Sequence, residues 1–191
     1  CSGTPLNFAL TSNLPSSFSW VANSNPNVTG ESLNPVISST ISDNLSHNSL
    51  INQTVTYSVT PISLAGSCSG IPLQVQVTVK PLPVMTSSNS ASVCSGVPLN
   101  VNLVTNIPSS ITWIANQNAS VLGESLSLQN SSLLNNTLTQ STLIPQNVIY
   151  TITPTSTIVG CQGNPQTLTV TVNPLPTMTS GTTAAFCSGT P

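Results

Sequence analysis

The chain has 191 residues, a formal net charge of −2, one basic side chain and three acidic ones. This excludes the basic surface that binds nucleic acid and the lysine-rich helix that lies on membranes. No apolar stretch approaches the roughly 18 residues of a membrane-spanning helix, so Ser, Thr, Asn and Gln supply a neutral polar surface that is more typical of extracellular proteins.

In chain order, the first feature is a heptapeptide that returns. CSGTPLN begins the chain, CSGVPLN follows at position 94 and CSGTP at 187, each time after an interval of 93 residues. The same interval relates Trp20 to Trp113 and Tyr57 to Tyr150 without any insertion. A period of this length is too long for a solenoid unit and suits a small domain with its own core, so the sequence predicts tandem domains cut from a longer array.

Within each repeat, apolar and polar residues alternate with period two. In the first repeat this pattern predicts strands over 5–12, 17–23, 54–60 and 71–80, with shorter strands around VTGESL and VISSTI inside 27–53. β-branched residues fill these runs, Pro and Asn-Ser end them, and no helical pattern longer than two turns competes.

These patterns predict an all-β fold of tandem immunoglobulin-like β-sandwich domains, arranged head to tail. The expected core aromatics are Trp20, Tyr57, Trp113 and Tyr150. We expect repeat 1 over 1–80 without its first strand, a proline linker over 81–83, repeat 2 over 84–173, and a second linker with the start of a third repeat over 174–191.

All five cysteines stand in a Cys-x-Gly motif, which favours disulfides in an oxidising compartment. Zinc is not expected, because CxxC pairs and nearby histidines are missing. Two pairings remain open. Pairing within repeats joins Cys1 to Cys68 and Cys94 to Cys161 and leaves Cys187 over, although a sandwich places the two motifs of one repeat at opposite ends. Pairing between repeats joins Cys1 to Cys161 across the joint of neighbouring domains.

The sequence predicts no catalytic, cofactor or metal site, and the protein is not expected to be an enzyme. The single histidine, His47, is Gln140 in the second repeat, so a hydrolytic triad cannot form in both copies. Glu31 and Glu124 are equivalent positions and not a pair, and each repeat has too few acids for calcium. We expect the glutamate of each GES motif to cap backbone N–H groups in a turn.

Together, CSGxPLN, SW or TW, GESL, TYSVTP or IYTITP, GC-x-G and VTVxPLP resemble the PKD-like, immunoglobulin-like repeats of giant cell-surface adhesins of Bacteroidota, the SprB-type gliding-motility adhesins. The resemblance covers both repeats end to end, although the acidic turn of the polycystin-type signature is missing. It implies export by type IX secretion, tandem arrays in a filament attached to the outer membrane, and adhesion during gliding.

On this reading the repeats are structural spacers of an extracellular adhesin, and their partners are neighbouring repeats, surface polysaccharide or other adhesin chains. The alternative is a module that binds carbohydrate or protein through the sandwich loops. Neither reading involves nucleic acid or insertion of this segment into a membrane.

Overall fold

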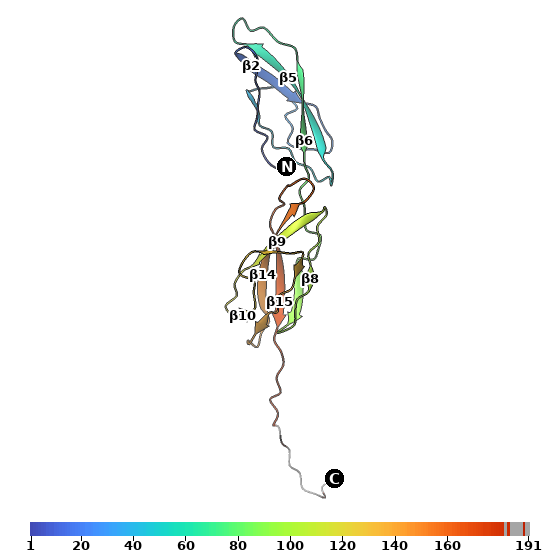
Figure 1. Cartoon of the computed structure of the whole chain (residues 1–191), viewed down its shortest axis with the longest axis vertical. Coiled ribbons are helices and arrows are strands. Elements are labelled where there is room, and N and C mark those ends of the chain that lie inside the picture. Colours follow the sequence, from blue (N-terminus) through green and yellow to red (C-terminus); the bar gives the residue numbers. More distant parts are fainter. Residues whose placement is uncertain (182, 184–188, 190–191) are drawn as a thin grey trace.

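The computed structural model describes residues 1–181, 183 and 189, and over these it contains strands and no helix. Two β-sandwiches follow one another along an elongated molecule, and the segment after the second leaves it at the end opposite the first (Figure 1). The predicted all-β tandem fold is therefore confirmed. Cys187 and most of the predicted start of a third repeat lie outside the described residues.

Repeat 1 consists of two facing layers. The larger sheet has the order β3-β2-β5-β6, and a two-stranded sheet pairs β1 with β4. The bounds are β1 Phe8–Ala9, β2 Ser16–Ala22, β3 Val36–Ile37, β4 Thr40–Ile41, β5 Gln53–Ser63 and β6 Leu73–Val79.

Repeat 2 has the same plan with three additional strands. β7 pairs in parallel with β15, and β10 pairs with β13 where repeat 1 has only the single bridge Thr29↔Ser46. Its large sheet has the order β11-β9-β14-β15-β7, and β12-β8 and β10-β13 form the opposite layer. The bounds are β7 Ser90–Cys94, β8 Val101–Asn102, β9 Ser109–Ala115, β10 Val121–Leu122, β11 Gln129–Asn130, β12 Leu133–Leu134, β13 Thr139–Gln140, β14 Gln146–Ser156 and β15 Gln166–Asn173.

The alternating residues of the long strands fill a separate core in each repeat. Trp20 and Tyr57 are buried in the first, and their rings meet edge to face with centroids 5.8 Å apart. Trp113 and Tyr150 repeat this pair at the same 5.8 Å in the second. Edge-to-face contact matches the charge distribution of aromatic rings and adds to the free energy of burying them.

Two predicted strands are shorter in the structure. Of the strand expected over 5–12, only Phe8–Ala9 forms a continuous ladder, while Pro5 makes a single bridge to Asn44 and the Leu6 and Leu10 N–H groups donate to Asp43 O and Ser39 O. VTGESL forms a turn with one bridge at Thr29, and not a strand. Gly30 has φ +90°, and a Cβ there would collide with the carbonyl oxygen of Asn44, so the chain turns at a position that only glycine fits.

The predicted role of the GES glutamates is confirmed. Glu31 accepts a hydrogen bond from the backbone N–H of Asn25 at 2.9 Å, and Glu124 accepts the equivalent bond from Asn118 at 2.8 Å. Each carboxylate therefore serves its own loop.

Candidate functional site: the joint between the repeats

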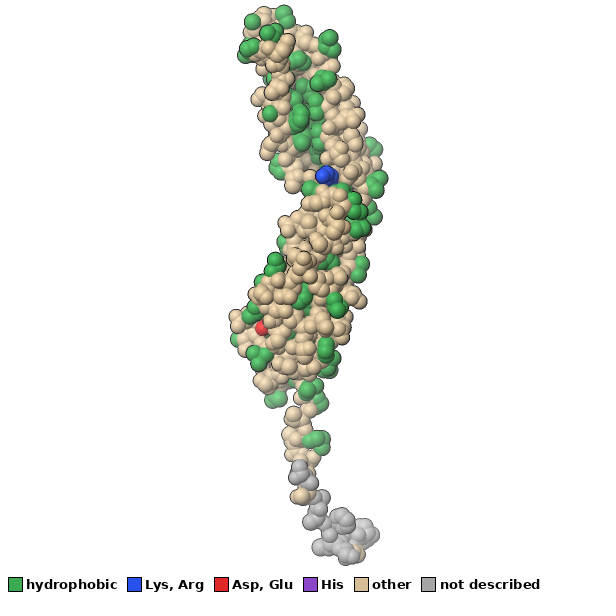
Figure 2. Space-filling view, viewed as in Figure 1, with side chains coloured by type: hydrophobic (Ala, Val, Ile, Leu, Met, Phe, Trp, Pro, Cys, Tyr) green, Lys and Arg blue, Asp and Glu red, His purple; other side chains and the backbone are tan. Residues whose placement is uncertain are grey.

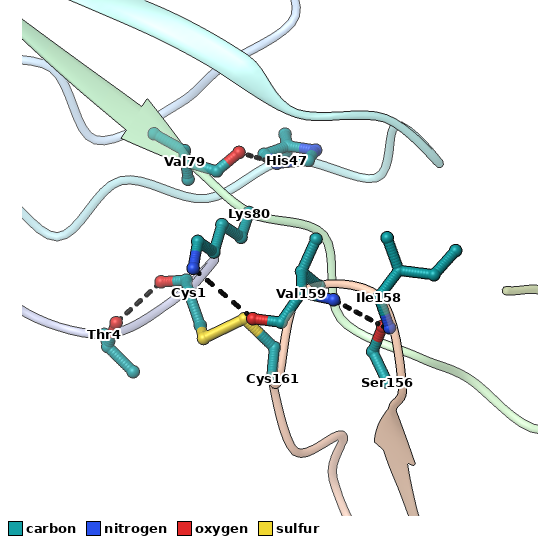
Figure 3. The surroundings of a disulfide bond; sticks show 9 residues. All are labelled: Cys1, Thr4, His47, Val79, Lys80, Ser156, Ile158, Val159 and Cys161. Atoms are coloured by element: carbon teal, nitrogen blue, oxygen red, sulfur yellow. Dashed lines mark hydrogen bonds between the residues drawn. A yellow bond between two sulfur atoms is a disulfide. The ribbon is translucent and has the colours of Figure 1, made fainter. Parts of the chain in front are cut away.

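The joint is the place where the Cys-x-Gly motif of Cys1, the Cys-x-Gly motif of Cys161 and the proline linker meet. A disulfide joins Cys1 of repeat 1 to Cys161 of repeat 2, with the α-carbons 5.8 Å apart (Figure 3). Of the two pairings left open by the sequence, the structure has the one between repeats. Cys161 is fully buried and Cys1 is exposed, so the bond closes the joint on one side.

The linker of the joint is three residues long. Before it, the carbonyl of Lys80 accepts a hydrogen bond from the Ser2 N–H at 2.8 Å, which ties it to repeat 1. After it, Val84 donates to Asn106 Oδ1 at 2.8 Å and Thr86 donates to Val104 O at 2.7 Å, which ties these residues to repeat 2. Only Pro81, Leu82 and Pro83 remain between the two bodies, and both prolines are buried.

The glycine of the CQG motif makes room for this linker. A Cβ on Gly163 would collide with the carbonyl oxygen of Pro83 and would lie 3.1 Å from Pro154 Cγ. Gly163 therefore allows the linker to pass directly against the β14–β15 turn, a close backbone approach of the kind that favours glycine. Sequence reasoning noted the motif and missed this role, because the contact is between residues 80 positions apart.

Side chains of both repeats also meet around the linker. Leu50 and Ile51 from repeat 1 and Ile107, Ile158 and Val159 from repeat 2 line a crevice of about 470 Å³. Lys80 Nζ donates to Val159 O at 3.4 Å across the joint (Figure 3). That bond is exposed, and Leu50, Ile51 and Ile158 are 55%, 70% and 72% exposed, so the linker and the disulfide hold the joint.

A buried serine shapes the loop that carries Cys161. Ser156 Oγ accepts hydrogen bonds from the N–H groups of Ile158 and Val159, both at 3.3 Å. The Ser156 N–H in turn donates to Cys161 O at 2.8 Å. These bonds fix the turn that presents the sulfur to Cys1, and sequence analysis did not single out Ser156.

The remaining candidate cysteines do not meet. Cys68 lies at the far tip of repeat 1 and Cys94 at the far end of repeat 2, and both are exposed free thiols. They are the positional equivalents of Cys161 and Cys1. Cys187 lies outside the described residues.

His47 has a structural place near the joint. Its Nε2 is 3.0 Å from Val79 O and its Nδ1 accepts from the Ser49 N–H at 3.1 Å, which fits a neutral ring with the proton on Nε2. Gln140 repeats the first bond, from its Nε2 to Val172 O at 3.3 Å. Gln140 Oε1 also repeats the second bond, by accepting from the Thr142 N–H at 2.8 Å. An amide can replace the imidazole here because each side chain offers a donor to the strand carbonyl and an acceptor to the loop N–H.

The tyrosines have strongly perturbed acidity. Burial, and then the 2.8 Å hydrogen bond from its hydroxyl to Asp43, raises the pKa of Tyr57 well above its ordinary value of 10. Burial raises the pKa of Tyr150 as well, with a smaller contribution from the charge of Glu124. Both are core groups without access to a substrate.

Over the part of the chain that the structure describes, no three of His, Cys, Asp and Glu gather where they could bind a metal ion. Within the same residues, no helix has the length and hydrophobicity to cross a membrane. The joint itself is held by one disulfide and a linker of three residues.

No curated protein matches the chain. Among solved structures, mouse cadherin-23 EC22-24 is 13% identical with a TM-score of 0.33, over 83% of this chain and 52% of that one. Human mucin-like protocadherin EC1-2 is 12% identical with a TM-score of 0.30, over 90% and 93%. Cadherin-like domains 1 to 4 of zebrafish RET are 11% identical with a TM-score of 0.25, over 84% and 41%.

The chain spans about half the length of the cadherin-23 fragment, and likeness at this level carries no argument about function. The family comparison is much more informative. The model of the PKD-like domain matches twice, over residues 1–83 and 91–176, and so covers both sandwiches and most of the chain. Together with the disulfide, this match indicates an extracellular protein. The chain belongs to the PKD-like domain family, of which it contains two tandem copies.

Proposed function

We propose that the two repeats are spacer domains of an extracellular adhesin, which set the length and stiffness of a stalk. PKD-like domains commonly serve as extracellular adhesion or spacer modules. The observation that carries the proposal is the covalent joint, in which Cys1–Cys161 and the linker Pro81–Pro83 connect neighbouring sandwiches at two points. Two connections restrict bending in a way that one flexible linker does not.

The finer form of this proposal is a filament attached to the outer membrane, exported by type IX secretion, in a gliding-motility adhesin of the SprB type. It is supported by the sequence resemblance alone. In such a filament the repeats contact neighbouring repeats of the same chain, while adhesion to surface polysaccharide or to other adhesin chains takes place elsewhere. We infer no catalytic activity for this segment.

The alternative function, binding through the sandwich loops, requires a similar open site in both repeats. The tip of repeat 1 has a groove of about 710 Å³ lined by Leu14, Pro15 and Leu64 among others. The equivalent tip of repeat 2 lies in the joint, where Ile107 is buried. Because the two copies differ in this way, the spacer reading is favoured.

A test uses the free thiols Cys68 and Cys94, which lie at opposite ends of the two-repeat body. With Cys187→Ser, a donor and an acceptor dye on these thiols report the distance between the ends in single molecules. We expect one narrow distance distribution for the oxidised chain and a broader one after Cys1→Ser with Cys161→Ser, which removes the disulfide without adding a third thiol. A broad distribution in the oxidised chain would refute the stalk. Binding of the two-repeat chain on a glycan array, lost when one loop is changed, would favour the alternative.

A further inference from the structure

We propose that a polar crevice between the two repeats binds a neutral saccharide and thereby regulates the stiffness of the joint. The crevice has a volume of about 560 Å³, and its walls come from residues on both sides of the linker. The proposal rests on the spacer function, because it concerns how firmly the two repeats of one stalk are held together. It does not involve the adhesive contacts of the filament.

The walls of the polar crevice are formed by loops of both repeats and by the linker. Repeat 1 contributes the loop with Asn48 and Ser49, and repeat 2 contributes residues that include Asn106 and Asn164. Leu82 of the linker also lines the crevice. Because the walls belong to different repeats, their separation depends on the angle at the joint. A ligand that touches both walls therefore binds only one arrangement of the two repeats.

Hydroxyl groups of the crevice are used within its own walls. Ser49 Oγ accepts hydrogen bonds from the Ile51 N–H at 3.3 Å and from Gln53 Nε2 at 3.1 Å. On the other side, Thr86 Oγ1 donates to Val104 O at 3.3 Å. These bonds hold the backbone of both walls in place.

Three amide side chains of the crevice have hydrogen-bonding groups that are not used in this way. Asn106 Oδ1 accepts from the Val84 N–H at 2.8 Å, which orients the side chain and leaves its Nδ2 group as a spare donor. Asn48 and Asn164 are exposed, and their side chains make no hydrogen bond within the described part of the chain. The spare Nδ2 group of Asn106 is not buried, so all three amides are accessible to a ligand.

The residues of the crevice favour an uncharged ligand. None of the described residues that line it is Asp, Glu, Lys or Arg, and both ring nitrogens of His47 are used within repeat 1. The face of the molecule drawn in Figure 2 has very few charged side chains. A charged ligand would therefore lose its hydration without gaining an opposite charge.

The free groups match the hydroxyl groups of a sugar. An amide donates through its NH₂ group and accepts through its oxygen, and a sugar hydroxyl does both. Leu82 and Val84 add apolar contact for the C–H groups of a sugar ring. A volume of about 560 Å³ lies within the range of roughly 300–1,000 Å³ of small-molecule sites. Because no Phe, Tyr or Trp is among the described residues of the crevice, we expect weak binding, with a Kd of about 1–10 mM.

Binding in the polar crevice should stiffen the joint. A sugar that bonds to Asn48 on one wall and to Asn106 or Asn164 on the other stabilises the arrangement to which it binds. Asn164 directly follows Gly163, whose backbone lies against Pro83 of the linker. The sugar would thus add a reversible connection to the two that the disulfide and the linker already make.

The first test is a titration of the full chain, followed by nuclear magnetic resonance, with every thiol outside the disulfide changed to serine. The isotope-labelled chain is titrated with glucose, galactose, mannose and N-acetylglucosamine, and with glucuronate and glucosamine as charged probes. At least one neutral sugar should shift the side-chain amide signals of Asn48, Asn106 and Asn164 with one common Kd. The charged probes should bind more weakly.

Matched variants locate the site. Asn164→Ala should weaken the binding of that sugar about tenfold, because it removes the hydrogen bonds of one amide. Asn116→Ala changes an exposed asparagine of repeat 2 outside the crevice and should leave the Kd unchanged. The backbone signals of the same spectra show that each variant is folded.

A second measurement reports the stiffness. It uses the chain with dyes at Cys68 and Cys94 and with Cys1→Ser and Cys161→Ser, whose joint lacks the disulfide. Saturation with the sugar should narrow the distance distribution of this chain. The same chain with Asn164→Ala should keep its broad distribution at that sugar concentration.

Each other outcome overturns the proposal. If no neutral sugar shifts the three amide signals, the crevice is not a saccharide site. Shifts confined to Asn106 and Asn164 show a site on repeat 2 alone, and equal loss of binding with Asn116→Ala shows a site elsewhere. Tighter binding of glucuronate or glucosamine excludes a site for neutral ligands, and a distribution that the sugar does not narrow excludes an effect on stiffness.

These outcomes are separate from the tests of the spacer function. The stalk is tested by the distance distribution of the oxidised chain without sugar. Binding with a Kd of about 1–10 mM is too weak to be retained on a glycan array, so the array still tests the alternative function by itself.

Discussion

The free energy of unfolding should depend strongly on the disulfide between the repeats. Cys1→Ser removes the bond at an exposed position and leaves Cys161 as a buried thiol, which behaves as a small apolar group. Cys94→Ser is a matched control, because it makes the same change at the equivalent, exposed and unpaired position of repeat 2.

The size of the effect follows from the length of the loop. Cys1 and Cys161 are 160 residues apart, and closing such a loop in the unfolded chain costs about 5 kcal/mol of conformational entropy. Freedom of the repeats about an uncrosslinked joint offsets part of this cost, but the short linker with its buried prolines limits that freedom. We therefore expect Cys1→Ser to lower the total free energy of unfolding by about 4–5 kcal/mol.

Urea unfolding measures this loss, and each repeat has one tryptophan whose fluorescence reports it. With a total m-value of about 2 kcal/mol/M, the midpoint should fall by about 2 M in Cys1→Ser. In Cys94→Ser the free energy should change by less than about 0.5 kcal/mol. The reasoning is refuted if both variants and the parent unfold at the same urea concentration without reductant.

Three further predictions concern single residues. The raised pKa values of Tyr57 and Tyr150 mean that the folded state holds their protons more tightly, so the free energy of unfolding is highest below about pH 10 and declines above it. Absorbance at 295 nm should show that both tyrosines ionise only as the chain unfolds. In urea with reductant, the same tyrosines should ionise near pH 10. Gly163→Ala should destabilise by about 1–3 kcal/mol and broaden the end-to-end distances in the dye experiment, whereas Gly181→Ala, which meets only Thr183 O at 3.7 Å, should do neither. His47→Gln should leave the thermal midpoint nearly unchanged, because Gln140 makes the same bond in repeat 2. His47→Ala should lower the free energy of unfolding by about 1–3 kcal/mol, because it leaves Val79 O without this donor. Equal midpoints for the two variants would contradict this role.

The strands and cores could be predicted from the sequence because they depend on local periodicity. Alternation along 17–23 and 54–60 placed Trp20 and Tyr57 on one face, and the structure buries both. The cap made by Glu31 was also within reach, since it links residues six apart. In each case the interaction lies within a loop or a strand, where the pattern of residue types carries the information.

The joint could not be predicted in the same way. The spacing of the cysteines allowed two pairings, because loop entropy is nearly the same for both and does not choose between them. The pairing depends on which ends of the two sandwiches meet. That arrangement depends on Gly163, which leaves room for the linker, and on Ser156, which shapes the turn before Cys161. These contacts join residues far apart in sequence, and no periodic signal marks them.

The two repeats also act as an internal comparison of what a neighbour does to a sandwich. Val77 and Val170 are the same residue type at the same position of the same strand, and yet Val77 is half-exposed and Val170 is fully buried. Cys68 and Cys161 differ in the same direction, one exposed and one buried. Because the sequences agree, the difference comes from β7 and from the joint, and not from local propensity. Repeat 2 thus completes its core with β7, the strand that precedes its Cys-x-Gly motif.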